Sequence, residues 1–128
     1  MIVRTLDSII GSEQHIVGAD FESRRILLKK DGLGYSFHDT IMEEGSEMHI
    51  QFKNHIETNY CIGGEGEVVD VATGETHPLK PGTIYVLDKH DAHILRATKG
   101  TLRLVCVFTP ALSGQEVHDE GGGYALLD

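Results

Sequence analysis

The sequence has little cysteine, few basic residues and no long apolar run for a chain of 128 residues. Its two cysteines, Cys61 and Cys106, are too few and too far apart for a disulfide framework or a thiolate zinc site. No segment approaches 18 uninterrupted apolar residues, so we predict no membrane-spanning helix and no membrane partner. The 11 basic residues stand against 20 acidic ones, and the resulting net charge of −9 argues against nucleic acid as a partner.

The N-terminus also lacks the layout of a secretory signal. Residues 1–5 contain no charged segment followed by an apolar one. We therefore expect a reduced, cytoplasmic protein. The length, with 40% hydrophobic and 24% charged residues, is that of an ordinary globular protein, and we predict a single domain over residues 1–128.

Turn signals recur at short intervals and separate short runs that are rich in β-branched and aromatic residues. One of these signals, Gly64–Gly66, is expected to turn the chain sharply after Glu57. Many short strands with evenly spaced turns are typical of an all-β jelly-roll barrel of antiparallel strands. Little helix is expected beyond a turn near Leu6–Ile10, and residues 110–128 are polar and glycine-rich, as in a flexible tail or lid. The expected strands are Arg25–Lys29, Tyr35–Ile41, His49–Phe52, Asn59–Ile62, Glu67–Val71, Ile84–Leu87, His93–Ala97 and Leu102–Phe108.

Two segments keep the spacing of a metal-site motif while their ligands differ. In Gly45–Gly64, Gln51 and Lys53 stand where a histidine pair would precede Glu57, and His93 follows in a second segment. This frame resembles the two motifs of the cupin superfamily, with a histidine pair missing from the first. Such a chain has either lost its metal or rebuilt the site, and Lys53 cannot bind a cation while it is charged.

A rebuilt site needs other donors inside the barrel. Side chains alternate between the two faces of a strand, which is expected to project Glu57, Tyr85, His93, Cys106 and Phe108 into one interior. The first three offer a carboxylate, a phenolate and an imidazole, a set that leaves coordination positions open and suits iron. The alternative is that Tyr85 lines the barrel, His93 is a hydrogen-bonded core histidine and Glu57 is a solvated carboxylate at a strand end.

Other polar residues have ordinary structural interpretations when they are taken one at a time. A buried Cys106 is typically a small hydrophobic residue, Thr40 a strand threonine and Arg25 a cation at a sheet edge. Glu116 and His118 belong to a polar cluster in the tail, for which solvation is the simpler interpretation. The residues alone do not select between these interpretations and functional ones.

Ordered motifs continue almost from one end of the chain to the other. They include Gly34–Thr40, Lys53–Glu57, Tyr60–Glu67, Tyr85–His93, Arg103–Phe108 and Gly114–Glu120. In these motifs the chain resembles the ectoine synthase family of the cupin superfamily. The resemblance implies a homodimer with the cupin fold. The implied activity is that of a hydro-lyase, which closes N-gamma-acetyl-L-2,4-diaminobutyrate into the osmoprotectant ectoine with loss of water. It also implies a ferrous iron held by Glu57, Tyr85 and His93.

The resemblance further assigns the substrate site and the catalytic groups. Thr40, Glu116 and His118 are the implied catalytic residues. A tyrosine is expected where Phe52 stands and a tryptophan where Phe21 stands, so a hydroxyl is missing at position 52. The alternatives that remain are another metal-dependent cupin enzyme, an oxygenase or isomerase, and a ligand-binding cupin without catalysis. The implied substrate-binding residues are Arg25, Thr40, Phe52, Cys106, Phe108, Glu116 and His118.

Overall fold

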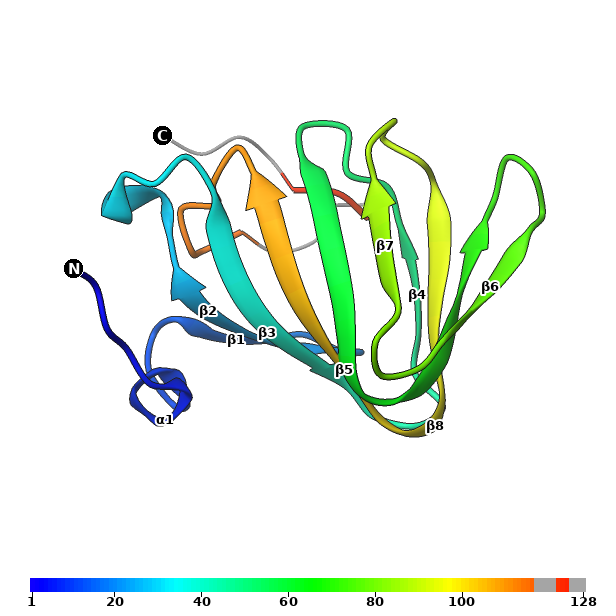
Figure 1. Cartoon of the computed structure of the whole chain (residues 1–128), viewed down its shortest axis with the longest axis horizontal. Helices are drawn as coiled ribbons and strands as arrows, with labels where there is room; N and C mark the ends of the chain where they lie inside the picture. Colours follow the sequence, from blue (N-terminus) through cyan, green and yellow to red (C-terminus); the bar gives the residue numbers. More distant parts are fainter. Residues whose placement is uncertain (117–121, 125–128) are drawn as a thin grey trace.

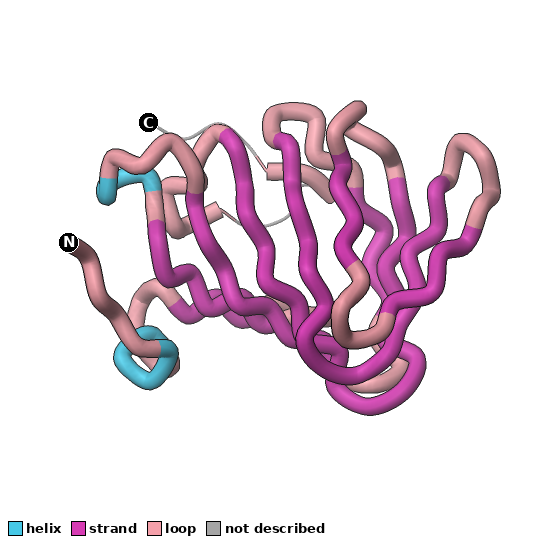
Figure 2. The backbone as a smooth tube through the Cα atoms, in the orientation of Figure 1, coloured by secondary structure: helices cyan, strands magenta, loops and turns pink. Residues whose placement is uncertain are grey.

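The computed structural model describes residues 1–116 and 122–124. Its antiparallel strands curl around one interior (Figure 1). Strands are the predominant secondary structure of the described residues, in which helix is confined to two short pieces near the N-terminus (Figure 2). Among the described residues, no helix is long and apolar enough to cross a membrane. The elements are α1 (Leu6–Ile9), β1 (His15–Val17), β2 (Glu22–Leu27), a 3-10 turn (Lys29–Asp31), β3 (Ser36–Met42), β4 (Glu47–Ile50), β5 (Ile56–Asp70), β6 (Thr76–Leu79), β7 (Ile84–Leu87) and β8 (His93–Thr109).

Two long, bent strands, β5 and β8, organise the barrel. The sheet order is β1-β2-β3-β8-β5-β6, with β4 paired to β8 and β7 paired to β5. β5 and β8 pair along most of their length, from Glu57 opposite Phe108 to Asp70 opposite His93. Each of these strands therefore contributes to both halves of the barrel, and each unites two of the segments expected from the sequence.

The run Gly64–Gly66 does not end the strand, which corrects the expectation of a sharp turn there. The pairing of β5 with β8 shifts register between Cys61 and Gly66, so the strand bends at bulges and continues. Gly64 has a φ of 67°, and a Cβ at this position would lie 2.2 Å from the carbonyl oxygen of Thr101. The glycine is required because the two backbones approach closely and the conformation is left-handed.

The short elements outside the predicted set lie at the edges. β1 and β6 were not predicted because they are short, and β6 contains Pro78, which is tolerated at a sheet edge. The turn expected near Leu6–Ile10 is α1, whose first turn is capped by Thr5 Oγ1 accepting from Ser8 N at 3.3 Å.

The barrel interior holds the core, as the alternation in the last strand predicts. Leu102, Leu104, Cys106 and Phe108 of β8 are all buried, whereas Arg103 points to the other face. Burying a leucine or phenylalanine side chain stabilises the fold by about 1.5–3 kcal/mol. This face of β8 is therefore both the centre of the core and one wall of the interior.

The described part of the C-terminal segment packs against the barrel. Leu112 is fully buried, its carbonyl accepts from Lys29 N at 2.8 Å, and its N–H donates to Ser36 Oγ at 3.0 Å. Tyr124 is also buried, and its carbonyl accepts from Asn54 Nδ2 at 2.9 Å. These contacts place residues 110–116 and 122–124 over the interior of the barrel.

Candidate active site and metal centre

A small cavity inside the barrel brings together many of the residues selected from the sequence. Thr40, Phe52, Glu57, Cys106 and Phe108 all line this space of about 30 Å³. They come from β3, the loop after β4, β5 and β8, so the convergence is a product of the fold and not of sequence proximity. The cavity is lined on its remaining sides by apolar side chains and by Ser23, Asn59 and Tyr124.

Glu57 is buried, so the alternative of a solvated strand-end carboxylate is wrong. Burial raises its pKa to about 7, although the hydrogen-bonding groups of Asn59 and Cys106 lower it in part. A carboxylate that loses its water is stabilised by a cation. Glu57 is thus placed as an anionic ligand would be, inside the barrel and facing polar side chains.

Tyr85 lies next to Glu57 on the neighbouring strand β7. Leu87 is the cross-strand partner of Glu57, and Tyr85 is the partner of Asn59. Burial raises the pKa of Tyr85 well above its ordinary value, and the negative charge of Glu57 raises it further. The phenol keeps its proton in this environment unless a bound cation stabilises the phenolate.

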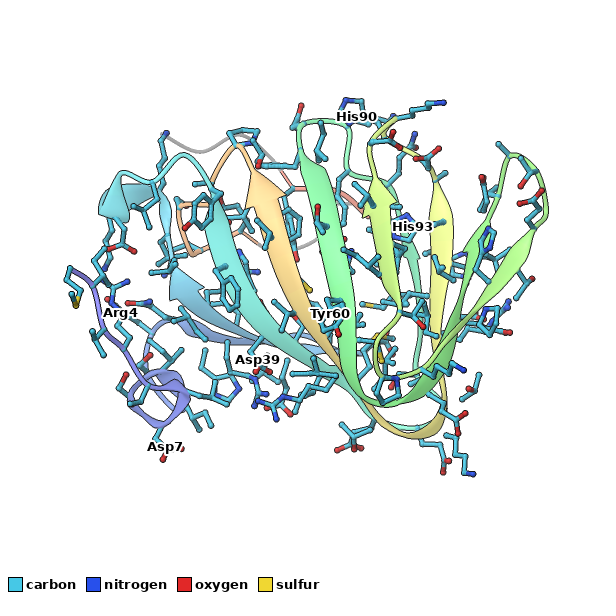
Figure 3. The ribbon with its side chains drawn as sticks, viewed as in Figure 1. Arg4, Asp7, Asp39, Tyr60, His90 and His93 are labelled. Atoms are coloured by element: carbon cyan, nitrogen blue, oxygen red, sulfur yellow. The ribbon has the colours of Figure 1, made fainter. Side chains whose placement is uncertain are left out.

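His93 lies at the start of β8 (Figure 3), and its tautomer suits a metal ligand. Its Nδ1 lies 2.9 Å from the carbonyl oxygen of Asp91, which can only accept, so Nδ1 carries the proton. Nε2 therefore presents a lone pair, and it is buried without a hydrogen-bond partner among the described residues. Burial lowers the pKa of His93, which keeps the ring neutral. A backbone carbonyl that fixes the opposite ring nitrogen is typical of ligating histidines.

By type, these three donors suit an iron ion. Glu57 lines the interior cavity, whereas Tyr85 and His93 border a second pocket of about 290 Å³, and the charge of Glu57 that raises the pKa of Tyr85 shows that these two side chains lie near each other. Within residues 1–116 and 122–124, no group of three His, Cys, Asp or Glu side chains could hold a metal, so a metal here needs the tyrosine. A carboxylate, a phenolate and an imidazole are ligands that iron accepts. The ligand set remains a prediction that the orphaned Nε2 supports.

Arg25 is fully buried and is not a cation at a sheet edge. Its Nε donates to Ser23 Oγ at 3.1 Å and its Nη1 to the carbonyl oxygen of Gly114 at 3.1 Å, while its guanidinium lies 5.5 Å from the centre of the Tyr124 ring. Nη2 has no hydrogen-bond partner among the described residues. Arg25 therefore binds the C-terminal segment through Nη1, and its Nη2 is available to donate to another acceptor.

Glu116 is buried too, so the interpretation as part of a solvated tail is wrong. Its carboxylate accepts from Ser113 N at 2.7 Å and Gly114 N at 2.8 Å, and lies 3.9 Å from Arg25 Nη1. Burial alone would raise the pKa of Glu116, but these backbone donors outweigh it and lower the pKa. Glu116 is an ionised group that orders the segment around it. His118, the other residue selected in the tail, lies outside the described residues.

Cys106 is a neutral hydrogen-bonding group. Its Sγ lies 3.1 Å from Asn59 Oδ1 and 3.5 Å from Thr40 Oγ1. Burial raises the pKa of the thiol well above its ordinary value, and the charge of Glu57 raises it further. The thiolate is the nucleophilic form of cysteine, so this side chain is suited to positioning and not to covalent attack.

The changed motif positions lie in the loop between β4 and β5 and not in a strand. Phe52 points inward and packs on Phe108 and Tyr124, with ring centroids at 5.1 and 5.0 Å. Lys53 is exposed, so it does not face the cation site, and Gln51 donates to the carbonyl oxygen of His90 at 3.1 Å. The phenylalanine therefore makes the apolar wall of the cavity where a hydroxyl was expected.

Two residues of the cavity were missed from the sequence. Tyr124 carried no motif signal because it follows a glycine-rich stretch. Asn59 lies two residues after Glu57 and so shares its face of the strand, a parity that could have identified it. Two other histidines, His49 and His90, are exposed on the surface (His90 is labelled in Figure 3).

Comparison with known proteins adds a full-length match. The family model described as ectoine synthase matches residues 1–128. A protein of Desulfatibacillum aliphaticivorans named L-ectoine synthase is 55% identical over 130 residues, covering 100% of this chain and 99% of its own. The crystal structure of an ectoine synthase from P. lautus has a TM-score of 0.88 and 50% identity, covering 99% of this chain and 91% of that one. A cupin domain of Schizosaccharomyces pombe, 16% identical, covers 70% of this chain and 64% of its own at a TM-score of 0.59 and shares the fold.

Proposed function

This chain belongs to the ectoine synthase family of hydro-lyases, and we propose that it closes N-gamma-acetyl-L-2,4-diaminobutyrate into ectoine with loss of water. The observation that carries the proposal is the interior cavity, which Thr40, Glu57 and Cys106 line together with Phe52 and Phe108. We further propose that the reaction takes place in the cytoplasm and serves protection against osmotic stress.

The barrel's contribution is to bind and orient a flexible substrate. Arg25 offers its unpaired Nη2 to the substrate carboxylate, an acceptor that suits a guanidinium fork. The rings of Phe52, Phe108 and Tyr124 enclose the aliphatic part and exclude water, which matters because ring closure expels water. Holding the amine against the carbonyl carbon contributes up to about 7–11 kcal/mol in favourable intramolecular reactions.

An iron ion would be held by Glu57, Tyr85 and His93, and when bound it supplies a Lewis acid for the amide oxygen. The His93 ring is already neutral with its lone pair free, and Glu57 already faces the cavity. Of the two catalytic residues that the resemblance implies in the tail, Glu116 accepts from backbone donors and is better suited to ordering the segment beside Arg25. We assign the role of proton carrier to His118.

The purified protein, incubated with N-gamma-acetyl-L-2,4-diaminobutyrate, should form a product lighter by one water, without consuming oxygen. Mass spectrometry of the product and an oxygen electrode measure the two quantities. Oxygen uptake coupled to substrate would instead indicate an oxygenase. Binding of the substrate without any product would indicate a ligand-binding cupin, and either result would reject the proposed function.

We also propose a homodimer, formed through the outer face of β5 and β7. Tyr60 and Ile84 are cross-strand partners on this face and are 45% and 59% exposed, with Ile62 and Val86 beside them. Copies of a chain with a net charge of −9 repel each other over most of their surface. A face made of apolar side chains lacks this repulsion and is the favourable place for two copies to meet.

Replacing Val86 with glutamate should raise the dimer dissociation constant by roughly 100-fold or more, because burying an unpaired charge in an apolar interface is strongly unfavourable. Sedimentation equilibrium at several concentrations measures this constant. Val71→Glu is the matched control, since Val71 is also exposed but follows the end of β5. Equal dissociation in both variants, or in neither, would argue against this interface.

A further inference from the structure

The Asn59 side chain is buried in the barrel while its amide nitrogen makes no hydrogen bond. The residue is 1% exposed, and Nδ2 has no partner among the described residues. Its Oδ1 is engaged, at 3.1 Å from Cys106 Sγ. A buried donor without an acceptor is unfavourable in a folded protein, so this nitrogen points to an acceptor that a bound molecule supplies.

The position of Asn59 places this donor at the centre of the proposed site. In the sheet register Asn59 lies between Tyr85 of β7 and Cys106 of β8. Its side chain lines the same cavity as Thr40 and Glu57. The Asn59 side chain lies near enough to the Glu57 carboxylate to lower its pKa, but Nδ2 does not reach hydrogen-bonding geometry with it and stays available to a bound acceptor.

The two ends of the proposed substrate differ in what they need from the protein. The carboxylate end suits the buried guanidinium of Arg25, which is not among the residues lining the cavity around Asn59. The acetamide end then lies in that cavity, near Glu57 and Asn59. Its carbonyl oxygen gains negative charge when the amine attacks, and neutral amide donors stabilise such an oxygen.

We propose that Asn59 is a catalytic residue that donates a hydrogen bond from Nδ2 to the acetamide oxygen of the substrate. The proposal rests on the ring closure proposed above. In that reaction a bond forms between the amine nitrogen and the carbonyl carbon, the carbon–oxygen bond breaks, and the oxygen leaves as water with both amine hydrogens. Asn59 transfers no proton; its hydrogen bond strengthens as the oxygen becomes anionic and is lost with the departing water.

The test uses Asn59→Leu, which keeps the size of the side chain and removes the donor. We expect kcat to fall about 100-fold, the usual effect of removing one donor to such an oxygen. The dissociation constant for ectoine should stay unchanged, because the product no longer contains this oxygen. Iron content should also stay at the wild-type level. Thr58→Val, a neighbouring change on the other face of β5, is the control and should alter none of these quantities.

Other outcomes overturn the proposal in distinguishable ways. A parallel rise in the ectoine dissociation constant would make Asn59 structural, and a loss of iron would assign it to orienting Glu57. An unchanged kcat would show that the donor is not used. Asn59→Ala, which cannot overfill the cavity, should repeat the pattern of Asn59→Leu. Failure of the wild-type protein to form ectoine would reject the ring closure itself, whereas ectoine from the wild type with unchanged variants would reject only the role of Asn59.

Discussion

Replacing Glu57 with glutamine should lower kcat for ectoine formation roughly a thousand-fold and should release most of the iron. The amide has the shape of the carboxylate but lacks its charge, and this buried carboxylate is the anionic ligand in the proposed iron site. A Lewis acid on the reacting oxygen is worth several kcal/mol, and each 1.4 kcal/mol or so corresponds to a tenfold change in rate. Initial rates and metal content by mass spectrometry measure the two effects.

The matched control is Glu65→Gln, the same substitution in the same strand at an exposed position. It should leave both rate and iron content unchanged. Removal of iron from the wild-type protein with a chelator should reproduce the loss of activity, and adding ferrous iron back should restore it. Full turnover by the iron-free protein would show that the Lewis acid is not needed, and the ligand set would then be rejected as a functional site.

Local features of this fold could be predicted from the sequence because they depend on neighbouring residues. The alternation Leu102, Leu104, Cys106 and Phe108 identified the inner face of β8, and all of these side chains are buried. The same parity carries Glu57 and Phe108 into one cavity, since they are cross-strand partners. The alternation of side chains along a strand predicts which of them are buried where the strand has one apolar face and one solvated face.

The prediction failed where a residue's surroundings come from distant parts of the chain. Gly64 was interpreted as a turn, but Thr101 packs against it and makes it a bend within a continuing strand. Arg25 and Glu116 were each assigned ordinary surface interpretations. Both are buried, and Arg25 donates to the carbonyl oxygen of Gly114, 89 residues away, and lies 3.9 Å from the Glu116 carboxylate.

Contacts between residues far apart in the sequence leave no pattern in the local sequence, yet they determine the chemistry of the site. The unpaired nitrogens of Arg25, Asn59 and His93 appear only when the strands that bury them are placed together. The sequence alone gives only the types of these three residues and their expected positions in strands. The structure shows that each presents a polar atom with no partner among the described residues, at different walls of one barrel.

Replacing Arg25 with methionine should raise KM for the acetylated substrate at least about 100-fold, with a smaller effect on kcat. The substitution removes the hydrogen bond from Nη2, which contributes about 1.5–3 kcal/mol to a charged acceptor, together with the positive charge that faces the carboxylate. The dissociation constant for ectoine should rise in parallel, because ring closure leaves the carboxylate in place. This pattern differs from that expected of Asn59→Leu, in which product binding is unchanged.

Two further variants distinguish the loss of the hydrogen bond to the substrate carboxylate from the loss of positive charge and from a loss of stability. Arg25→Lys keeps the charge but not the fork, and should recover only part of the affinity. Arg24→Met removes the neighbouring cation, which pairs with Asp39, and should affect stability without changing KM. Equal increases in KM for Arg24→Met and Arg25→Met would mean that net charge or folding, and not contact with the carboxylate, sets substrate affinity. Because Arg25 also holds Gly114, thermal unfolding of Arg25→Met should show a lower Tm, and KM should be measured well below it.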